Sequence, residues 1–111
     1  MKQDRLKLIE DMLDKNPDDA FLNYAAALEY KKLEQDQKAK SLLEKINVKS
    51  PEYLAVYYQL GKLYESENSI DKAIAVYKKG LEIAKNQDDL KTFGELSEAL
   101  LMIDEDFDGG N

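Results

Sequence analysis

The chain has no cysteine, no histidine and no tryptophan among its 111 residues. Without cysteine and histidine it can form neither a disulfide framework nor a Cys/His zinc site. The same absences exclude a thiol nucleophile and a Ser-His-Asp triad. The sequence also lacks a Gly-rich phosphate-binding loop and a serine nucleophile elbow. We therefore expect a protein that is not an enzyme and that carries no cofactor.

Positive charge is scarce, because 16 Lys and Arg stand against 23 Asp and Glu, for a net charge of −7 at pH 7. Binding to phosphates needs a basic surface, so this balance argues against a nucleic-acid partner. No stretch approaches the roughly 18 apolar residues of a membrane span. Residues 1–16 mix charged and apolar side chains, unlike a signal peptide. We expect no membrane partner and a cytoplasmic location, which the absence of cysteine fits.

Apolar residues recur at spacings of three and four along nearly the whole chain, which is typical of amphipathic helices. Pro17 and Pro51 follow Asn16 and Ser50, so we expect helix starts there, with Asn16 and Ser50 as caps. Asn68 is expected in the left-handed conformation, with Ser69 capping the next helix. The polar breaks predict six helices, near residues 3–15, 18–33, 36–47, 51–67, 70–85 and 88–103.

Identical or similarly small residues recur 34 positions apart, and four such pairs at one offset indicate a repeat of two helices. The pairs are Pro17 and Pro51, Ala27 and Gly61, Tyr30 and Tyr64, and Ala39 and Ala73. This period resembles the tetratricopeptide repeat (TPR) family. The repeat at 54–87 carries nearly the whole family pattern, in Tyr57, Leu60, Gly61, Tyr64, Ala73, Tyr77 and Gly80.

The repeat at 20–53 departs from the pattern. It has Asn23 where an aromatic is usual and Ile46 where a small residue is usual, and Glu34 replaces the turn glycine. We therefore expect an irregular turn at Glu34. The resemblance implies an all-α domain over 1–103, with antiparallel helix-turn-helix repeats stacked in a right-handed superhelix. A partial repeat at 1–19 and a capping helix at 88–103 would flank the full repeats.

The resemblance further implies a concave groove that binds a peptide or helix of another protein. Its lining positions are Phe21, Tyr24, Leu28 and Lys31 in one repeat and Ala55, Tyr58, Lys62 and Glu65 in the next. Lys31 and Lys62 leave room for an acidic segment. The carboxylate clamp of some relatives is absent, because its positions hold Tyr24, Leu28 and Gln59. In the alternative interpretation, the groove aromatics pack against the terminal helices as part of the core.

Two further functions stay open. Apolar residues near the C-terminal end favour self-association, so the chain is expected to be a monomer or a homodimer; they are Leu96, Leu100, Leu101 and Ile103. The segment Asp104–Gly109 has the D-x-D-x-D-G spacing that opens a calcium-binding loop. The sequence ends before the closing glutamate of such a loop, so a disordered acidic tail at 104–111 is the favoured interpretation.

Overall fold

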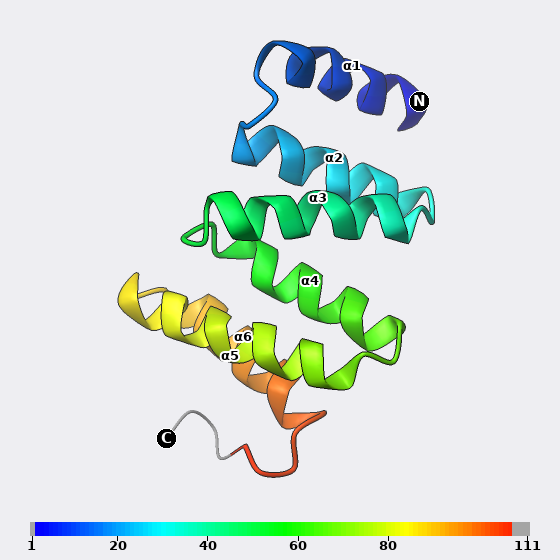
Figure 1. The fold of residues 1–111 in the computed structure, drawn as a ribbon. Coiled ribbons are helices and arrows are strands. Elements are labelled where there is room, and N and C mark those ends of the chain that lie inside the picture. The colour runs from blue at the N-terminus through cyan, green and yellow to red at the C-terminus, as the bar shows by residue number, and fades with distance from the viewer. Residues whose placement is uncertain (1, 108–111) are drawn as a thin grey trace. The chain divides into compact units, whose positions relative to one another are not determined.

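The computed structural model describes residues 2–107, and all regular structure within that range is helical (Figure 1). The prediction of six helices in an all-α fold is confirmed. The chain divides into two compact units, residues 1–53 and 54–111. The helices are α1 (Lys2–Lys15), α2 (Ala20–Lys32), α3 (Asp36–Lys49), α4 (Ala55–Ser66), α5 (Ile70–Asn86) and α6 (Leu90–Leu101).

The start of α2 differs from the prediction that Asn16 caps it. The Asn16 amide donates to the Met12 carbonyl at 3.1 Å, so Asn16 closes the last turn of α1. The cap of α2 is Asp19, whose side chain accepts a hydrogen bond of 2.8 Å from the Leu22 amide. A carboxylate at this position satisfies one of the free amides of the first turn.

The expected helix start at Ser50 and Pro51 is also wrong. The Ser50 amide donates to the Ile46 carbonyl at 2.7 Å and so ends α3. The Ser50 carbonyl then accepts from the Tyr53 amide at 2.9 Å, which closes a turn around the exposed Pro51. Helix α4 begins four residues after this proline, at Ala55.

Three helix ends share one geometry, including the turn that we expected to be irregular. Glu34, Asn68 and Asp88 have positive φ angles of 60°, 64° and 56°. The residue after each of them donates its amide five residues back, for example from Gln35 to Tyr30 at 2.9 Å. This is the Schellman motif, which satisfies the last carbonyls of a helix. The left-handed Asn68 is confirmed, whereas the irregular turn at Glu34 is wrong. Ser69 precedes α5, but its side chain makes no capping hydrogen bond.

The first unit contains α1, α2 and α3, which run antiparallel to their chain neighbours (Figure 1). The hydroxyl of Tyr30 on α2 donates to Glu10 Oε2 on α1 at 2.7 Å. Asn23 is 3% exposed, and its Nδ2 donates to the carbonyls of Pro17 at 3.0 Å and Asp19 at 2.8 Å. The polar residue that breaks the family pattern therefore ties the α1–α2 loop to α2. Leu6, Ile9 and Ala26 form a buried apolar cluster.

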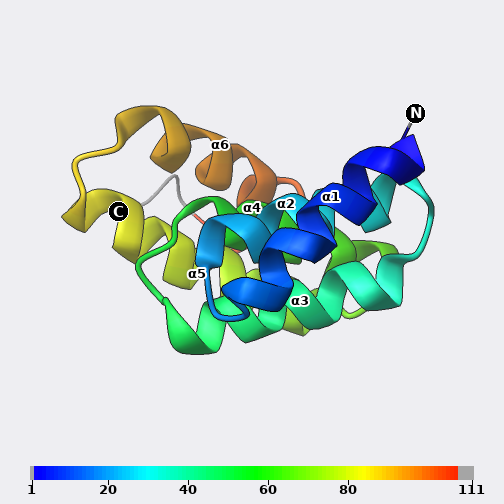
Figure 2. The same ribbon diagram turned by 90° about the horizontal axis from the view of Figure 1, so that it is seen from above.

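The second unit contains α4, α5 and α6, and α6 packs mainly against α5 (Figure 2). Gly61 on α4 lies against the Tyr77 ring of α5, so closely that an added Cβ would overlap the ring. A Cβ at Gly80 would likewise meet Tyr57 and Leu96. Small residues thus let these helices approach. The buried cluster consists of Leu54, Tyr57, Ala73, Tyr77, Leu81, Ala84, Leu96, Ala99 and Leu100.

The residues of the repeat pattern divide by burial. Those fully buried in the described chain are Ala27, Ala39, Tyr57, Leu60, Gly61, Ala73, Tyr77 and Gly80. Tyr30 and Tyr64 are half-buried, and Pro51 is exposed. The alternation of small and aromatic residues therefore serves packing, apart from the proline, which lies in a surface turn.

Residues 104–107 belong to the segment that we expected to be disordered, and in the structure they form turns. The Asp104 carboxylate lies 3.5 Å from the Lys78 ammonium, and Phe107 packs against the buried cluster of the second unit. An apolar contact and a half-shielded ion pair thus hold the first part of this segment. The helices that the structure describes are all too short or too polar to cross a lipid bilayer.

Candidate functional site

A hollow of about 240 Å³ lies between α4 and α6 in the second unit. Tyr58 and Lys62 line it from α4, and both are among the predicted groove residues. The remaining lining residues follow one another at helical spacing along α6 and its C-terminal cap residue: Glu95, Glu98, Ala99 and Met102. We call this feature the α4–α6 hollow.

Lys62 is held in place by two neighbours within the second unit. Its ammonium lies 3.7 Å from Glu65 Oε2 and 5.4 Å from the centre of the Tyr58 ring. Glu65 Oε2 also accepts a 2.5 Å hydrogen bond from the Tyr77 hydroxyl. Burial, followed by the hydrogen bond to Glu65, raises the pKa of Tyr77 well above its ordinary value. The Tyr58 and Tyr77 rings are 6.4 Å apart, so the wall of the hollow is continuous with the core.

Two further predicted groove residues also lie on α4, the exposed Ala55 and the half-buried Glu65, and the remaining four lie on α2 in the first unit. Phe21 is 66% exposed, and Lys31 is also exposed. Tyr24 is half-buried, with its ring centre 5.5 Å from that of Tyr53, and Leu28 is half-buried. Burial, and then the charge of Asp19, raises the pKa of Tyr53. We call Phe21, Tyr24, Leu28 and Lys31 the α2 face.

The groove aromatics differ in how they are packed. Tyr58 packs against the buried cluster that includes residues of α6, as the core interpretation expects. Tyr58 is nevertheless only half-buried and borders the hollow. Phe21 is mostly exposed, so it remains available for contact.

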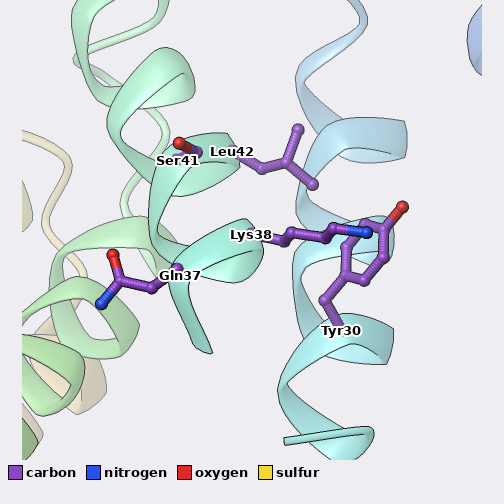
Figure 3. A pocket seen from close by; sticks show the side chains of 5 residues that line it. All are labelled: Tyr30, Gln37, Lys38, Ser41 and Leu42. Atoms are coloured by element: carbon purple, nitrogen blue, oxygen red, sulfur yellow. The ribbon is translucent and has the colours of Figure 1, made fainter. Parts of the chain in front are cut away.

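A second hollow, of about 400 Å³, lies between α2 and α3 in the first unit (Figure 3). Lys38 and Leu42 reach from α3 toward Tyr30 on α2, and the Lys38 ammonium lies 5.4 Å from the Tyr30 ring centre. The hydrogen bond to Glu10, followed by burial, raises the pKa of Tyr30. This hollow is shallow and open, and its aromatic ring is already covered by a cation.

Sequence reasoning missed the α6 side of the α4–α6 hollow. It treated residues 88–103 as a cap and assigned only apolar self-association residues there. The available signal was the spacing of Glu95, Glu98, Ala99 and Met102, which places them on one helix face. The expected self-association surface needs correction, because Leu96 and Leu100 are fully buried and Ile103 is half-buried. Of that set only Leu101 is well exposed.

The acidic C-terminal segment offers no assembled metal site in the part that the structure describes. Asp104 Oδ1 accepts a hydrogen bond of 3.1 Å from the Asp106 amide. No three acidic groups converge as metal ligands within residues 2–107. Asp108 and Gly109, which complete the proposed calcium spacing, lie outside the described residues.

Comparison with known proteins places the chain in a family. The family model for the tetratricopeptide repeat matches residues 54–87. A crystal structure of a tetratricopeptide repeat domain protein from Salinibacter ruber is 37% identical, with a TM-score of 0.76, over 78% of this chain and 97% of that one. A solution structure of a tetratricopeptide repeat domain protein from the same organism gives the same identity and TM-score, over 80% and 90% of the two chains. The chain therefore belongs to the tetratricopeptide repeat family.

A more distant likeness concerns the fold alone. The MamA RS-1 ArsTM double mutant is 20% identical, with a TM-score of 0.64, over 96% of this chain and 69% of that one. None of the curated protein sequences matches the chain. Tetratricopeptide repeats generally mediate protein–protein interactions and are typically non-enzymatic scaffolds.

Proposed function

We propose that this chain is a non-enzymatic interaction module that binds a peptide or helix of another protein. The observation that carries the proposal is the α4–α6 hollow, with the half-exposed Tyr58 on its wall. The hollow is open to solvent on one side, and its volume near 240 Å³ leaves room for one side chain of a partner. Aromatic side chains beside a polar rim are typical of protein-binding surfaces.

The α2 face is the second contact surface in this proposal. Phe21 exposes a large apolar side chain to solvent, and Tyr24 lies beside it on the helix. The proposed partner is a protein, with neither nucleic acid nor membrane involved, and the proposed compartment is the cytoplasm. Residues 20–53 and 54–87 would be the full repeats, with 1–19 as a partial repeat and 88–103 as the cap.

Affinity capture with matched variants tests this function. Immobilised wild-type chain, Tyr58→Ala and the double variant Tyr24→Ala plus Tyr58→Ala are compared for the proteins that they retain. We expect Tyr58→Ala to retain less of each bound protein than wild type, and the double variant to retain none. Leu90→Ala is the control, because Leu90 is 83% exposed and belongs to neither surface. Unchanged capture by the double variant, with helical content intact by circular dichroism, would contradict the proposal.

A further inference from the structure

Acidic charge is concentrated in the second unit. Residues 54–111 contain six lysines and twelve aspartates and glutamates, so they carry −6 of the total charge of −7. The first unit is therefore almost neutral. A uniform acidic surface would be a general solubility feature, whereas this asymmetry gives the second unit its own electrostatic field.

The cation of the α4–α6 hollow is already neutralised. Lys62 pairs with Glu65 at 3.7 Å and lies over the Tyr58 ring. Glu65 is in turn held by the Tyr77 hydroxyl. An acidic partner segment would have to compete with these contacts, so Lys62 is a poor anchor for one. The contacts of Lys62 therefore argue against the acidic segment for which the sequence left room.

The two carboxylates of the hollow, unlike the ammonium of Lys62, have no charged partner among the described residues. The side chains of Glu95 and Glu98 are exposed, and neither carboxylate makes a hydrogen bond or ion pair with the described residues. They flank an apolar surface formed by Tyr58, Ala99 and Met102. Ala99 is buried, whereas Met102 is 80% exposed. The hollow thus combines an apolar floor with two unpaired negative charges on one helix face.

We infer that the segment bound in the α4–α6 hollow is basic and amphipathic. Lysine or arginine side chains of the partner would pair with Glu95 and Glu98, while an apolar side chain contacts Tyr58 and Met102. Charge complementarity of this kind sets partner choice and accelerates association. The inference rests on the proposed function and names the chemistry of its partner.

Selection from a phage-displayed library of random peptides tests the inference. The immobilised wild-type chain is the bait, and the most enriched peptide is synthesised for titration. We expect enriched peptides with at least two basic residues around an apolar one. The double variant Glu95→Gln plus Glu98→Gln should bind the peptide about tenfold more weakly, as expected for the loss of two exposed charge pairs. This difference should shrink as salt is raised.

A control variant separates the site from the general field. Glu105→Gln plus Asp106→Asn removes the same charge from exposed residues outside the hollow, and it should keep affinity within about twofold of wild type. Equal weakening by both double variants would overturn the inference, because a diffuse acidic field would then explain the binding.

The remaining outcomes distinguish failure of the inference from failure of the function. Uncharged or acidic peptides whose binding still needs Tyr58 would overturn the inference and leave the proposed function standing. A selection without any peptide that depends on Tyr58 would overturn both. If the wild type sediments as a dimer and Tyr58→Ala as a monomer, a second copy occupies the hollow, and the inference is again overturned.

Discussion

The hydroxyl of Tyr77 on α5 donates a hydrogen bond of 2.5 Å to Glu65 Oε2 on α4. The same ring covers Gly61, one helical turn before Glu65. One buried tyrosine therefore fixes the α4–α5 pair by packing and by a charge-assisted hydrogen bond. Because Glu65 also holds Lys62, the core contact of Tyr77 orders a side chain of the α4–α6 hollow.

Gly61 leaves no space for a side chain. Gly61→Ala should lower the free energy of unfolding by about 1–3 kcal/mol, because its Cβ would overlap three atoms of the Tyr77 ring. Gly61→Leu should lower it further. Thermal and urea unfolding followed by circular dichroism measure both effects.

Gly94 on α6 provides the matched control. A Cβ there meets no atom within 4 Å, so Gly94→Ala should stabilise the helix by about 0.5–1 kcal/mol. If Gly61→Ala stabilised the chain as Gly94→Ala does, the close packing of Gly61 against Tyr77 would be refuted.

The raised pKa of Tyr77 predicts a loss of stability at alkaline pH. Its folded pKa lies above the ordinary value of 10.0, mainly because the phenol is buried. The stabilising contribution of the protonated phenol is therefore complete below pH 10.0 and is lost as the pH rises through the folded pKa. Urea unfolding across this range, with tyrosinate absorbance as a second readout, measures the loss.

Tyr77→Phe keeps the ring and removes the ionisable group. Its free energy of unfolding should fall less steeply above pH 10.0 than that of wild type. A residual fall is expected, because the pKa values of Tyr30 and Tyr53 are also raised. An identical pH profile for Tyr77→Phe and wild type would rule out Tyr77 as a source of the alkaline loss.

Residue spacing was enough to predict the helices, because packing requires small and aromatic residues at fixed offsets. Gly61 and Tyr77 illustrate this, since their contact follows from the repeat pattern. The helix starts were harder to predict, because Asn16 and Ser50 suit a cap and also the end of the preceding helix. Their amides bond backward, to Met12 and Ile46, and only the full hydrogen-bond network decides between these roles.

The candidate site was predictable on α4 and not on α6. Tyr58 and Lys62 occupy positions that the repeat pattern assigns to the groove. Glu95 and Glu98 lie beyond the last repeat, where no pattern assigns a role. Their place in the hollow follows from how α6 packs in the second unit, which depends on contacts such as that of Leu96 with the Gly80 position.

An aromatic residue at position 23, which the family pattern favours, should lower the stability of this chain. Asn23→Tyr would remove the bonds to the Pro17 and Asp19 carbonyls and would force a larger side chain into a site that is 3% exposed. Asn23→Ala should lower the free energy of unfolding by about 1–3 kcal/mol through the lost hydrogen bonds alone.

Asn47 is the control for Asn23, because its buried Nδ2 has no hydrogen-bond partner within the described chain. Asn47→Ala should therefore lose less stability than Asn23→Ala in parallel urea titrations. Equal losses would show that the Asn23 bonds contribute little and that burial of an amide group governs both sites.

Glu34 offers the opposite kind of substitution, one that should stabilise the chain. Its φ of 60° places a residue with a Cβ in the left-handed region, which costs about 1–2 kcal/mol for most residues. Glu34→Gly should therefore raise the free energy of unfolding by up to about 1 kcal/mol, after the entropy of the more flexible unfolded chain is deducted. Asn68→Gly should gain less, because asparagine tolerates the same conformation better.

Gln35→Gly is the control. At a φ of −100° it relieves no strain, so it should destabilise the chain. This order of thermal midpoints, with Glu34→Gly highest and Gln35→Gly lowest, follows from the backbone alone, because Glu34 and Asn68 end their helices with the same pair of hydrogen bonds. A midpoint for Glu34→Gly at or below that of wild type would mean that the Glu34 side chain contributes more than its backbone strain costs.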